Sequence, residues 1–442
     1  MNRQAILCVG DMISAYKAFG ILIKAGRSFT NELIFGRDGM RVLIADQFEE
    51  SGREGLALLG CDVVYQPKLK DQPLLEEMQK LKPDVLVVRS AKVNAAMLGV
   101  EPLKLVVRAG AGYNTIDVPA ASKHGIFVSN CPGKNSIAVA ELTFALILAL
   151  DRRIVDNVVA LRAGKWNKSE FSRTRGLHGR RLGLIGTGQI AQEVIIRAKA
   201  FGMPVAAWSR SLNVQRAGEM GISYLSSPEM LAECSDIVSV HIALAEETRG
   251  LIGAEFFAAL HPGAYFINTS RGEIVDQTAL ELAMREKGFR VGLDVYAGEP
   301  SSGTDQFDTP VAKQPGFCGT HHIGGSTEQA QEAIAAETVR IIKTFKESGE
   351  VPNAVNLARR TPATCVLAVR HYDRPGVLAS VLGAISMSRI NVQEMENVIF
   401  EGAEAAVAQI HLEREPSAYM LEELLEANKD ILEMNVIPVT SG

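Results

Sequence analysis

The sequence predicts an α/β protein with two doubly wound parallel-sheet domains and a smaller C-terminal domain of ferredoxin-like topology. Two successive series of short apolar runs alternate with helical patterns, which is typical of βαβ units and a parallel sheet. The last 80 or so residues instead follow the order β-α-β-β-α-β, which is the ferredoxin-like pattern. A length of 442 residues agrees with about two to four domains.

The first series begins at Met40 and contains short strands joined by helices. Its predicted strands cover 41–45, 61–65, 85–88, 103–107 and 126–128, with helices around 56–59 and over 74–81. A long apolar helix over 136–151 then leads into the second series. The strands of that series are expected at 182–185, 205–208, 237–240, 265–268 and 291–295, and the series ends near Cys318. A helix over 327–347 follows.

Composition excludes several functional classes. Lys and Arg total 46 against 51 for Asp and Glu, so the net charge of −5 provides no basic face for nucleic acid. The six cysteines are scattered without a CxxC pair, which argues against a disulfide framework or a metal site and favours a reducing compartment. No stretch of about 18 apolar residues or clean signal peptide is found, so we expect a cytoplasmic protein without membrane contact.

A glycine-rich turn closes the strand at 182–185 and opens a helix. Gly186, Gly188 and Ala191 form a G-x-G-x-x-A pattern, in which the first glycine permits the tight turn and the second lets a pyrophosphate approach the backbone. The free N–H groups and the dipole of the following helix attract phosphates. The turn therefore predicts a dinucleotide site and a Rossmann-type domain.

The next strand of this series does not decide between NAD and NADP. It ends in Trp208-Ser209-Arg210, with no acidic residue to bind the ribose diol of NAD. Ser209 and Arg210 could receive the 2′-phosphate of NADP, or Arg210 could stack on the adenine. The sequence is therefore compatible with either NAD or NADP as the cofactor.

Three residues near predicted strand ends together suit hydride transfer at a 2-keto or 2-hydroxy acid. Arg271 follows Asn-Thr-Ser, Glu299 lies in Asp-Val-Tyr-Ala-Gly-Glu-Pro, and His322 precedes Ile-Gly-Gly-Ser-Thr. A guanidinium can hold the substrate carboxylate, and a histidine can exchange the hydroxyl proton. A carboxylate on the other ring nitrogen would fix the histidine tautomer.

These motifs resemble the D-isomer-specific 2-hydroxyacid dehydrogenases, and among them the D-3-phosphoglycerate dehydrogenases. The resemblance covers nearly all of the chain beyond Met40 and implies catalytic roles for Arg271, Glu299 and His322. Many members carry Pro where this chain has His321, so the choice of His322 depends on the Ile-Gly-Gly that follows it. The resemblance also implies the remaining cofactor-binding residues, which are Gln189, Ile190, Thr269, Asp294 and Gly324.

Substrate-binding residues are expected at the strand ends of the first series. Arg89 and Arg108 are candidates for a substrate carboxylate or phosphate, and Asn135 and Ser136 for amides at a helix N-terminus. A solvated arginine at a strand end is the alternative in each case. A basic run of Lys165, Lys168, Arg173 and Arg175 is either a solvated face or, as the resemblance suggests, reaches the active site of a neighbouring subunit.

The resemblance implies a discontinuous organisation. A substrate-binding domain would comprise 40–141 and 319–348, around a nucleotide-binding domain over 142–318. Residues 1–39 would form an N-terminal extension or reflect a poorly chosen start site. A linker over 349–362 would lead to the C-terminal domain over 363–442.

The C-terminal domain resembles an ACT domain, an amino-acid-sensing module. ACT domains usually pair edge to edge, so a homodimer or homotetramer is expected. The effector positions of serine-regulated relatives correspond to His371, Asp373 and Asn391. Asp373 stands where those relatives carry Asn and lacks an amide donor, so an effector site and a purely structural dimerisation module both stay open.

The leading prediction is NAD(P)-dependent oxidation of 3-phospho-D-glycerate to 3-phosphohydroxypyruvate, the entry to serine biosynthesis. A glyoxylate or hydroxypyruvate reductase is the alternative, and Ser209-Arg210 would suit it. A third possibility, from another class, is a non-catalytic nucleotide-sensing scaffold. The ACT-like domain favours the first prediction.

Overall fold

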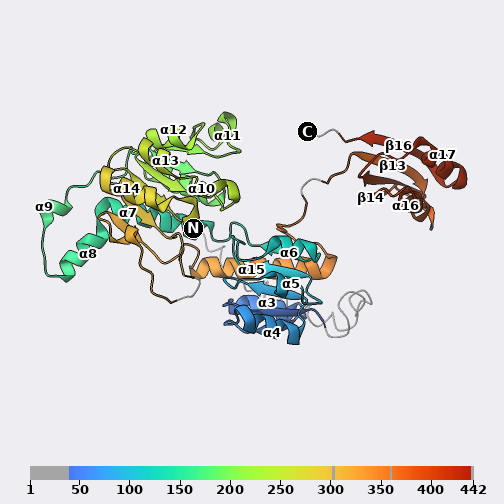
Figure 1. Ribbon diagram of the computed structural model, residues 1–442, viewed down its shortest axis with the longest axis horizontal. Helices are drawn as coiled ribbons and strands as arrows, with labels where there is room; N and C mark the ends of the chain where they lie inside the picture. The colour runs from blue at the N-terminus through green and yellow to red at the C-terminus, as the bar shows by residue number, and fades with distance from the viewer. Residues whose placement is uncertain (1–38, 301–303, 359–360, 440–442) are drawn as a thin grey trace, which may run out of the picture. The chain divides into compact units, whose positions relative to one another are not determined.

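The computed structural model describes residues 39–300, 304–358 and 361–439 (Figure 1). Nearly all of the predicted N-terminal extension, residues 1–39, lies outside these residues. The chain divides into two compact units, with the boundary between Asn356 and Leu357. The first unit contains two parallel sheets and the second contains one antiparallel sheet.

The first sheet has five parallel strands in the order β2-β1-β3-β4-β5. The strands are β1 (Arg41–Ile44), β2 (Asp62–Tyr65), β3 (Val85–Val88), β4 (Leu105–Arg108) and β5 (Phe127–Asn130). The connecting helices are α3 (Glu50–Leu58), α4 (Asp71–Leu81), α5 (Ala95–Leu98) and α6 (Val118–Lys123). All four residues of β3 are buried, because helices cover both faces of such a sheet. This order is that of a flavodoxin-like sheet, which is one form of the predicted doubly wound parallel sheet.

The second sheet has seven parallel strands in the order β12-β11-β10-β9-β6-β7-β8. The strands are β6 (Leu182–Ile185), β7 (Val205–Trp208), β8 (Ser223–Tyr224), β9 (Ile237–Val240), β10 (Tyr265–Asn268), β11 (Arg290–Leu293) and β12 (Phe317–Gly319). The helices are α10 (Gln189–Ala200), α11 (Val214–Glu219), α12 (Pro228–Glu233), α13 (Ala254–Ala259) and α14 (Gln277–Lys287). The chain order reverses between β6 and β9, which is the switch point of a Rossmann fold.

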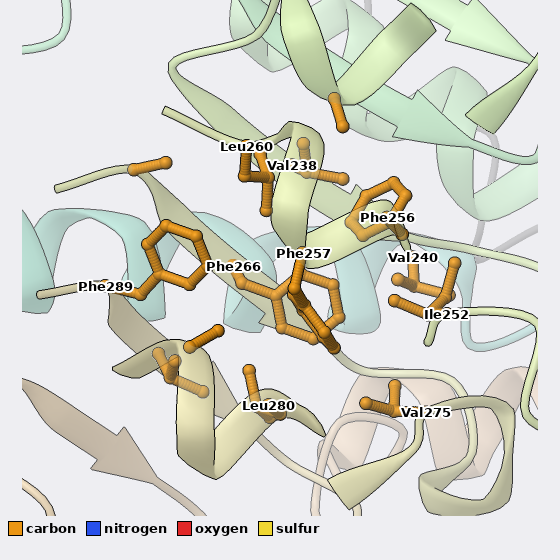
Figure 2. Packing of buried hydrophobic residues seen from close by; sticks show 14 of the residues in the cluster. Val238, Val240, Ile252, Phe256, Phe257, Leu260, Phe266, Val275, Leu280 and Phe289 are labelled. Atoms are coloured by element: carbon orange, nitrogen blue, oxygen red, sulfur yellow. The ribbon is translucent and has the colours of Figure 1, made fainter. Parts of the chain in front are cut away.

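Aromatic side chains fill much of the core on one face of the second sheet (Figure 2). Phe257 of α13 meets Phe266 of β10 edge to face, with ring centroids 5.3 Å apart. Phe256 lies against the same strand residue at 6.3 Å. Such pairs add to the stability gained from burying the rings, and they hold the strands that carry the site.

Two long helices of the first unit pack with different sheets, α7 with the second and α15 with the first. Helix α7 (Ser136–Arg152) packs against α10, β10 and β11, so it runs across the predicted boundary at 141. Helix α15 (Glu328–Ser348) packs against α3 of the first sheet, and Thr327 caps its N-terminus. The chain then runs back along β5: Val355 donates its N–H to Val128, and Asn356 accepts the Val128 N–H. The first part of the predicted linker is therefore part of the first unit.

Helices α8 (Ile154–Arg162) and α9 (Lys168–Phe171) extend away from the second sheet (Figure 1). Neither contains a buried residue. The segment is nevertheless ordered by its own contacts, since Arg153 pairs with Asp156 at 2.9 Å and with Glu170 at 3.0 Å. These helices present apolar side chains to solvent.

The second unit has four antiparallel strands in the order β14-β15-β13-β16. Its elements are β13 (Cys365–Tyr372), α16 (Val377–Met387), β14 (Val392–Ile399), β15 (Ala405–Leu412), α17 (Ala418–Ala427) and β16 (Ile431–Pro438). The ferredoxin-like prediction is confirmed. Among the described helices of the whole chain, none has the length and apolar content needed to cross a bilayer.

Candidate active site

The glycine-rich turn lies at the switch point of the second sheet. Gly186 has a φ of +102°, and a Cβ there would collide with the carbonyl of His241 at the end of β9. Glycine is therefore required both by the backbone conformation and by the close approach of two strand ends. This turn directs the chain from β6 into α10.

The N-terminus of α10 fits a dinucleotide pyrophosphate. Gly188 is the N-cap, and a Cβ built there would meet nothing within 4 Å, so the space above it is open. Gln189 is exposed and Ile190 is half-buried in the first turn of this 12-residue helix. Free N–H groups and the helix dipole at this end favour a bound anion.

The end of β7 carries hydroxyl groups and a cation. The hydroxyl groups of Thr187 and Ser209 are hydrogen-bonded at 2.9 Å. Arg210 is exposed beside them. These residues fit the ribose side of either dinucleotide, and the cation suits a 2′-phosphate.

A histidine and a carboxylate meet in the loops that follow β11 and β12 of the second sheet. His322 Nδ1 lies 2.8 Å from Glu299 Oε1, and the two side chains are 45% and 30% exposed. A carboxylate at this distance accepts the Nδ1 proton and leaves Nε2 as the free ring nitrogen. The adjacent His321 is exposed. The contact thus joins the predicted pair, His322 and Glu299.

Asp294 fixes the loop that carries His322. It is 1% exposed, and its carboxylate accepts hydrogen bonds from the Thr320 hydroxyl at 2.6 Å and from the N–H groups of Ile323 and Gly324 at 2.8 Å each. Its backbone carbonyl accepts the N–H of His322, which has a φ of +54°. Asp294 therefore holds the histidine loop, in addition to any contact with a cofactor.

Arg271 is presented by a tight turn after β10. Asn268 accepts the N–H of Ser270 and donates to the Arg271 carbonyl, both at 2.9 Å, which closes the turn. The guanidinium reaches the loop after β4: a Cβ on Gly112 would collide with it, and Asn114 Oδ1 lies 3.5 Å away. Burial lowers the pKa of Arg271, while Glu299 and Glu273 act to raise it. Arg271 thus links the two sheets.

Two more arginines lie near Arg271. The Arg108 guanidinium packs over Gly110, two residues from the glycine under Arg271, so the two groups lie within about 10 Å of each other. Burial, with the charges of Arg271 and Arg89 adding to it, lowers the pKa of Arg108 to about 10. Among the described residues, none of the three guanidiniums forms an ion pair with a carboxylate. The group forms a positive site without direct ion pairs among the described residues, called here the arginine cluster (Arg89, Arg108 and Arg271).

At the N-terminus of α7, one of the two predicted amides already has a partner within the chain. The Ser136 N–H donates to the Gly133 carbonyl at 3.1 Å, and Ser136 is 4% exposed, so its amide is already used. Asn135 keeps a buried side-chain oxygen without a partner. The Thr269 hydroxyl meets that of Thr143 in α7 at 3.2 Å.

The four residues of the predicted basic run are exposed, on and around α9. Arg175 pairs with Asp236 at 3.1 Å within the same domain. The contacts described for the other three, Lys165, Lys168 and Arg173, do not tie them to the arginine cluster.

The predicted effector residues of the second unit do not meet within one copy. His371 is 1% exposed, and its ring nitrogens lie 2.8 Å from the Tyr372 carbonyl and 3.2 Å from Asn397. In register, His371 aligns with the end of β14, whereas Asn391 directly precedes its start. Eight strand residues separate them by roughly 25 Å. Asp373 is exposed near His371. One copy therefore cannot bring all three residues onto one small ligand.

Several residues of the site have no sequence motif. Asp46 lies at the end of β1 and binds the loop that carries Arg89. His241 is buried beside Gly186, and burial lowers its pKa to about 3, so it is neutral. An acidic residue at the carboxyl end of a strand is the one signal that could have identified Asp46 in advance.

Comparison with known proteins identifies the family. Residues 144–324 match the family described as D-isomer specific 2-hydroxyacid dehydrogenase, NAD binding domain. A D-3-phosphoglycerate dehydrogenase of Methanocaldococcus jannaschii is 32% identical over 84% of this chain and 67% of its own length. A glyoxylate reductase of Thermococcus litoralis is 36% identical over 72% of this chain and 96% of its own length.

A solved structure gives the same result. The NAD+-bound 3-phosphoglycerate dehydrogenase of Entamoeba histolytica superposes with a TM-score of 0.60 and 27% identity, covering 72% of this chain and 99% of that one. The chain spans 60% of the length of the Bacillus subtilis D-3-phosphoglycerate dehydrogenase that it matches. The dinucleotide domain binds NAD or NADP. The chain belongs to the D-isomer-specific 2-hydroxyacid dehydrogenase family.

Proposed function

We propose that this chain oxidises 3-phospho-D-glycerate to 3-phosphohydroxypyruvate with NAD or NADP, the first step of serine biosynthesis. The observation that carries the proposal is the arginine cluster. The positive charges of Arg271 and Arg89 both act to lower the pKa of Arg108. Three half-buried guanidiniums that form no ion pair within the described part of the chain repel one another, and an anion between them relieves that repulsion.

The charge of the cluster suits a substrate with two anionic groups. A simple 2-hydroxy acid brings one carboxylate, which a single arginine can hold in a bidentate way. A phosphorylated hydroxy acid brings a second anion for the remaining guanidiniums. In this assignment Arg271 holds the carboxylate, while Arg89 and Arg108 hold the phosphate.

The histidine and its carboxylate move the proton. Nε2 of His322 accepts the proton of the C2 hydroxyl, and Glu299 stabilises the imidazolium that forms. Arg271 polarises the C2–O bond as it becomes a carbonyl. When bound, the oxidised dinucleotide supplies the acceptor for the C2 hydride. Asp294 keeps the histidine loop in place throughout.

A glyoxylate or hydroxypyruvate reductase is the second candidate. The similarity to the Thermococcus litoralis glyoxylate reductase over 96% of its length supports it, and so does the absence of an acidic residue at the end of β7. Glyoxylate has one carboxylate and would use one of the three arginines. The arginine cluster therefore favours the first candidate.

Steady-state kinetics of the full chain test the proposal. Reduction of NAD and of NADP is followed with 3-phospho-D-glycerate, and oxidation of the reduced cofactors with glyoxylate and hydroxypyruvate. Turnover of 3-phospho-D-glycerate at a higher kcat/KM than that of any unphosphorylated acid is expected. Efficient glyoxylate reduction without phosphoglycerate turnover would replace the proposal by the second candidate.

We also propose that the protein forms a homodimer or homotetramer. Ile154, Val159 and Leu161 of α8 are 48%, 61% and 56% exposed, and the nearby Trp166 is 81% exposed. Several exposed apolar side chains on and beside one short helix are typical of an association site. Sedimentation analysis should give at least a dimer, and Val159→Asp with Leu161→Asp should shift it towards monomer.

A further inference from the structure

A buried carboxylate that no sequence motif marks lies behind the arginine cluster. Asp46 is 6% exposed and follows β1, which pairs with β3. Because parallel neighbours end at the same edge of the sheet, Asp46 directly faces the loop 89–91 that leaves β3.

Among the described residues, those that donate hydrogen bonds to the Asp46 carboxylate all belong to that loop. Oδ2 accepts the N–H groups of Arg89 at 2.7 Å and of Ser90 and Ala91 at 2.9 Å each. Oδ1 accepts the Ser90 hydroxyl at 2.8 Å. Four hydrogen bonds to one carboxylate fix three successive residues of the loop.

The carboxylate is ionised in this setting. Burial alone would raise the pKa of Asp46, but the hydrogen bonds from Ala91, Arg89 and Ser90 outweigh burial and lower it below its ordinary value. Its negative charge also favours the charged forms of Arg89 and Arg108. The carboxylate thus offsets part of the repulsion within the arginine cluster.

Neutral donors, and not the Arg89 guanidinium, occupy the oxygens of Asp46. The guanidinium points instead to the loop that precedes α15, where Nη2 lies 3.2 Å from the Ser326 hydroxyl. Asp46 therefore supplies counter-charge without competing with a bound anion for the guanidinium. An ion pair at the same place would have neutralised Arg89.

We propose that Asp46 is a positioning residue for substrate selection: it orients Arg89 towards the second anionic group of the substrate and lowers the cost of gathering three guanidiniums. The inference depends on the proposed function, since it assigns Arg89 to the phosphate. The proposal predicts that loss of the Asp46 charge weakens the binding of phosphorylated substrate specifically.

Asp46→Asn tests the proposal, because the amide keeps the shape but loses the charge and one acceptor. KM for 3-phospho-D-glycerate is expected to rise about tenfold or more with kcat within about twofold, whereas KM for D-glycerate changes by less than about twofold.

Asp84→Asn is the matched control. Asp84 is 7% exposed at the opposite end of the same sheet, where it accepts the Arg41 N–H and pairs with Lys104 at 2.9 Å. The Asp84→Asn variant should have a lower Tm, and its KM values for both substrates should stay within about twofold of those of the wild type.

A double-mutant cycle separates positioning from a general effect on folding. Arg89→Gln alone should raise KM for the phosphorylated substrate, and Asp46→Asn should raise KM much less in that background than in wild type, because Asp46 acts mainly through Arg89. Additive effects, or equal defects with both substrates, would overturn the proposal.

If Asp46→Asn fails to fold, Ser90→Ala removes one of the four contacts and should raise KM about twofold to threefold for the phosphorylated substrate alone. An unchanged KM in that variant would count equally against the proposal.

Failure of the proposed function would look different. Wild-type protein would then turn over glyoxylate but not phosphoglycerate. Inorganic phosphate as a competitive inhibitor would decide the role of Asp46 in that case. A Ki about tenfold higher in Asp46→Asn than in wild type would support positioning of Arg89, whereas an equal Ki, or no inhibition of the wild type, would refute it.

Discussion

At the scale of single residues, the chemistry depends on which side chains meet across loops distant in sequence. The sequence predicted Arg271, Glu299 and His322 because each follows a strand end in a distinctive run of residues. The structure brings His322 and Glu299 to 2.8 Å and directs Arg271 towards the loop after β4. Their catalytic roles stay predictions that substitution can test.

His322→Gln removes the proposed proton acceptor. It is expected to lower kcat by about 10²- to 10⁴-fold, the usual contribution of a general acid–base group, and to leave the dissociation constant of the nucleotide within about twofold. His321→Gln is the matched control and should retain kcat. Equal losses in the two variants, or full turnover in His322→Gln, would exclude this role.

The pKa of Arg108 predicts a pH effect on substrate binding. Burial and the charges of Arg271 and Arg89 lower this pKa to about 10, so Arg108 is charged below that pH and neutral above it. KM for 3-phospho-D-glycerate should therefore rise by up to about tenfold between roughly pH 9 and pH 11. Arg108→Gln should show a high KM at every pH and lack this rise. A rise of the same size in the variant would assign it to another group.

Arg210 offers a test of cofactor choice. Its exposed guanidinium at the end of β7 can pair with the 2′-phosphate of NADP, which NAD lacks. Arg210→Ala should raise KM for NADP about tenfold and change that for NAD by less than about twofold. Arg216→Ala, an exposed arginine in α11, is the control and should change neither. Equal effects on the two cofactors would contradict a role in 2′-phosphate binding.

The sequence did not reveal Asp46, Asn114 or the role of Asp294 in holding the histidine loop. Each of these acts through contacts with residues tens to hundreds of positions away, such as Arg89 for Asp46. Hydrophobic periodicity and local motifs carry no information on such pairs. The sequence also did not reveal that the Ser136 amide donates to the Gly133 carbonyl in a local turn.

At the scale of elements, the strands were the most predictable features. The predicted strand over 265–268 coincides with β10, and that over 205–208 coincides with β7, because short apolar runs buried on both faces leave little choice of boundary. The exposed helices α8 and α9 were not predicted. Their apolar residues face solvent in a single chain, so the usual match between apolar periodicity and a core is missing.

Helix α15 is tied to neighbouring loops through Glu337. Its carboxylate pairs with Arg340 at 2.6 Å and Lys134 at 3.4 Å, and accepts a hydrogen bond from Asn353 at 2.7 Å. The Arg340 hydrogen bond is the main cause that lowers the pKa of Glu337 from 4.5 to about 2, against the opposing effect of burial. Glu337 therefore stabilises the folded state above its ordinary pKa, and this stabilisation is lost as the pH falls towards 2.

Glu337→Gln should remove that pH dependence. The midpoint of urea unfolding is expected to fall at neutral pH, and the difference between variant and wild type should shrink between about pH 4.5 and pH 2. Glu347→Gln, at the exposed end of the same helix, should show little difference at any pH. A difference for Glu337→Gln that stays constant with pH would contradict the account.

At the scale of the whole molecule, the two-unit division follows from composition and order of elements. Alternating strands and helices predicted two parallel sheets, and the final β-α-β-β-α-β order predicted the antiparallel one. The exact start of the linker was not predictable, because Val355 and Asn356 join the first unit through backbone contacts with Val128 that no sequence pattern marks. The candidate active site belongs to the first unit, and the predicted effector residues belong to the second, where they do not meet within one copy.

The central claim is that the arginine cluster selects a substrate with two anionic groups. The ratio of kcat/KM for 3-phospho-D-glycerate to that for D-glycerate, measured in wild type and in Arg89→Gln, tests it most directly. We expect a wild-type ratio of about 10 to 100, the range given by a charged hydrogen-bonded pair, and a ratio several-fold lower in Arg89→Gln, in which Arg108 still holds the phosphate. A wild-type ratio at or below 1, or a ratio that Arg89→Gln leaves unchanged, would contradict the claim.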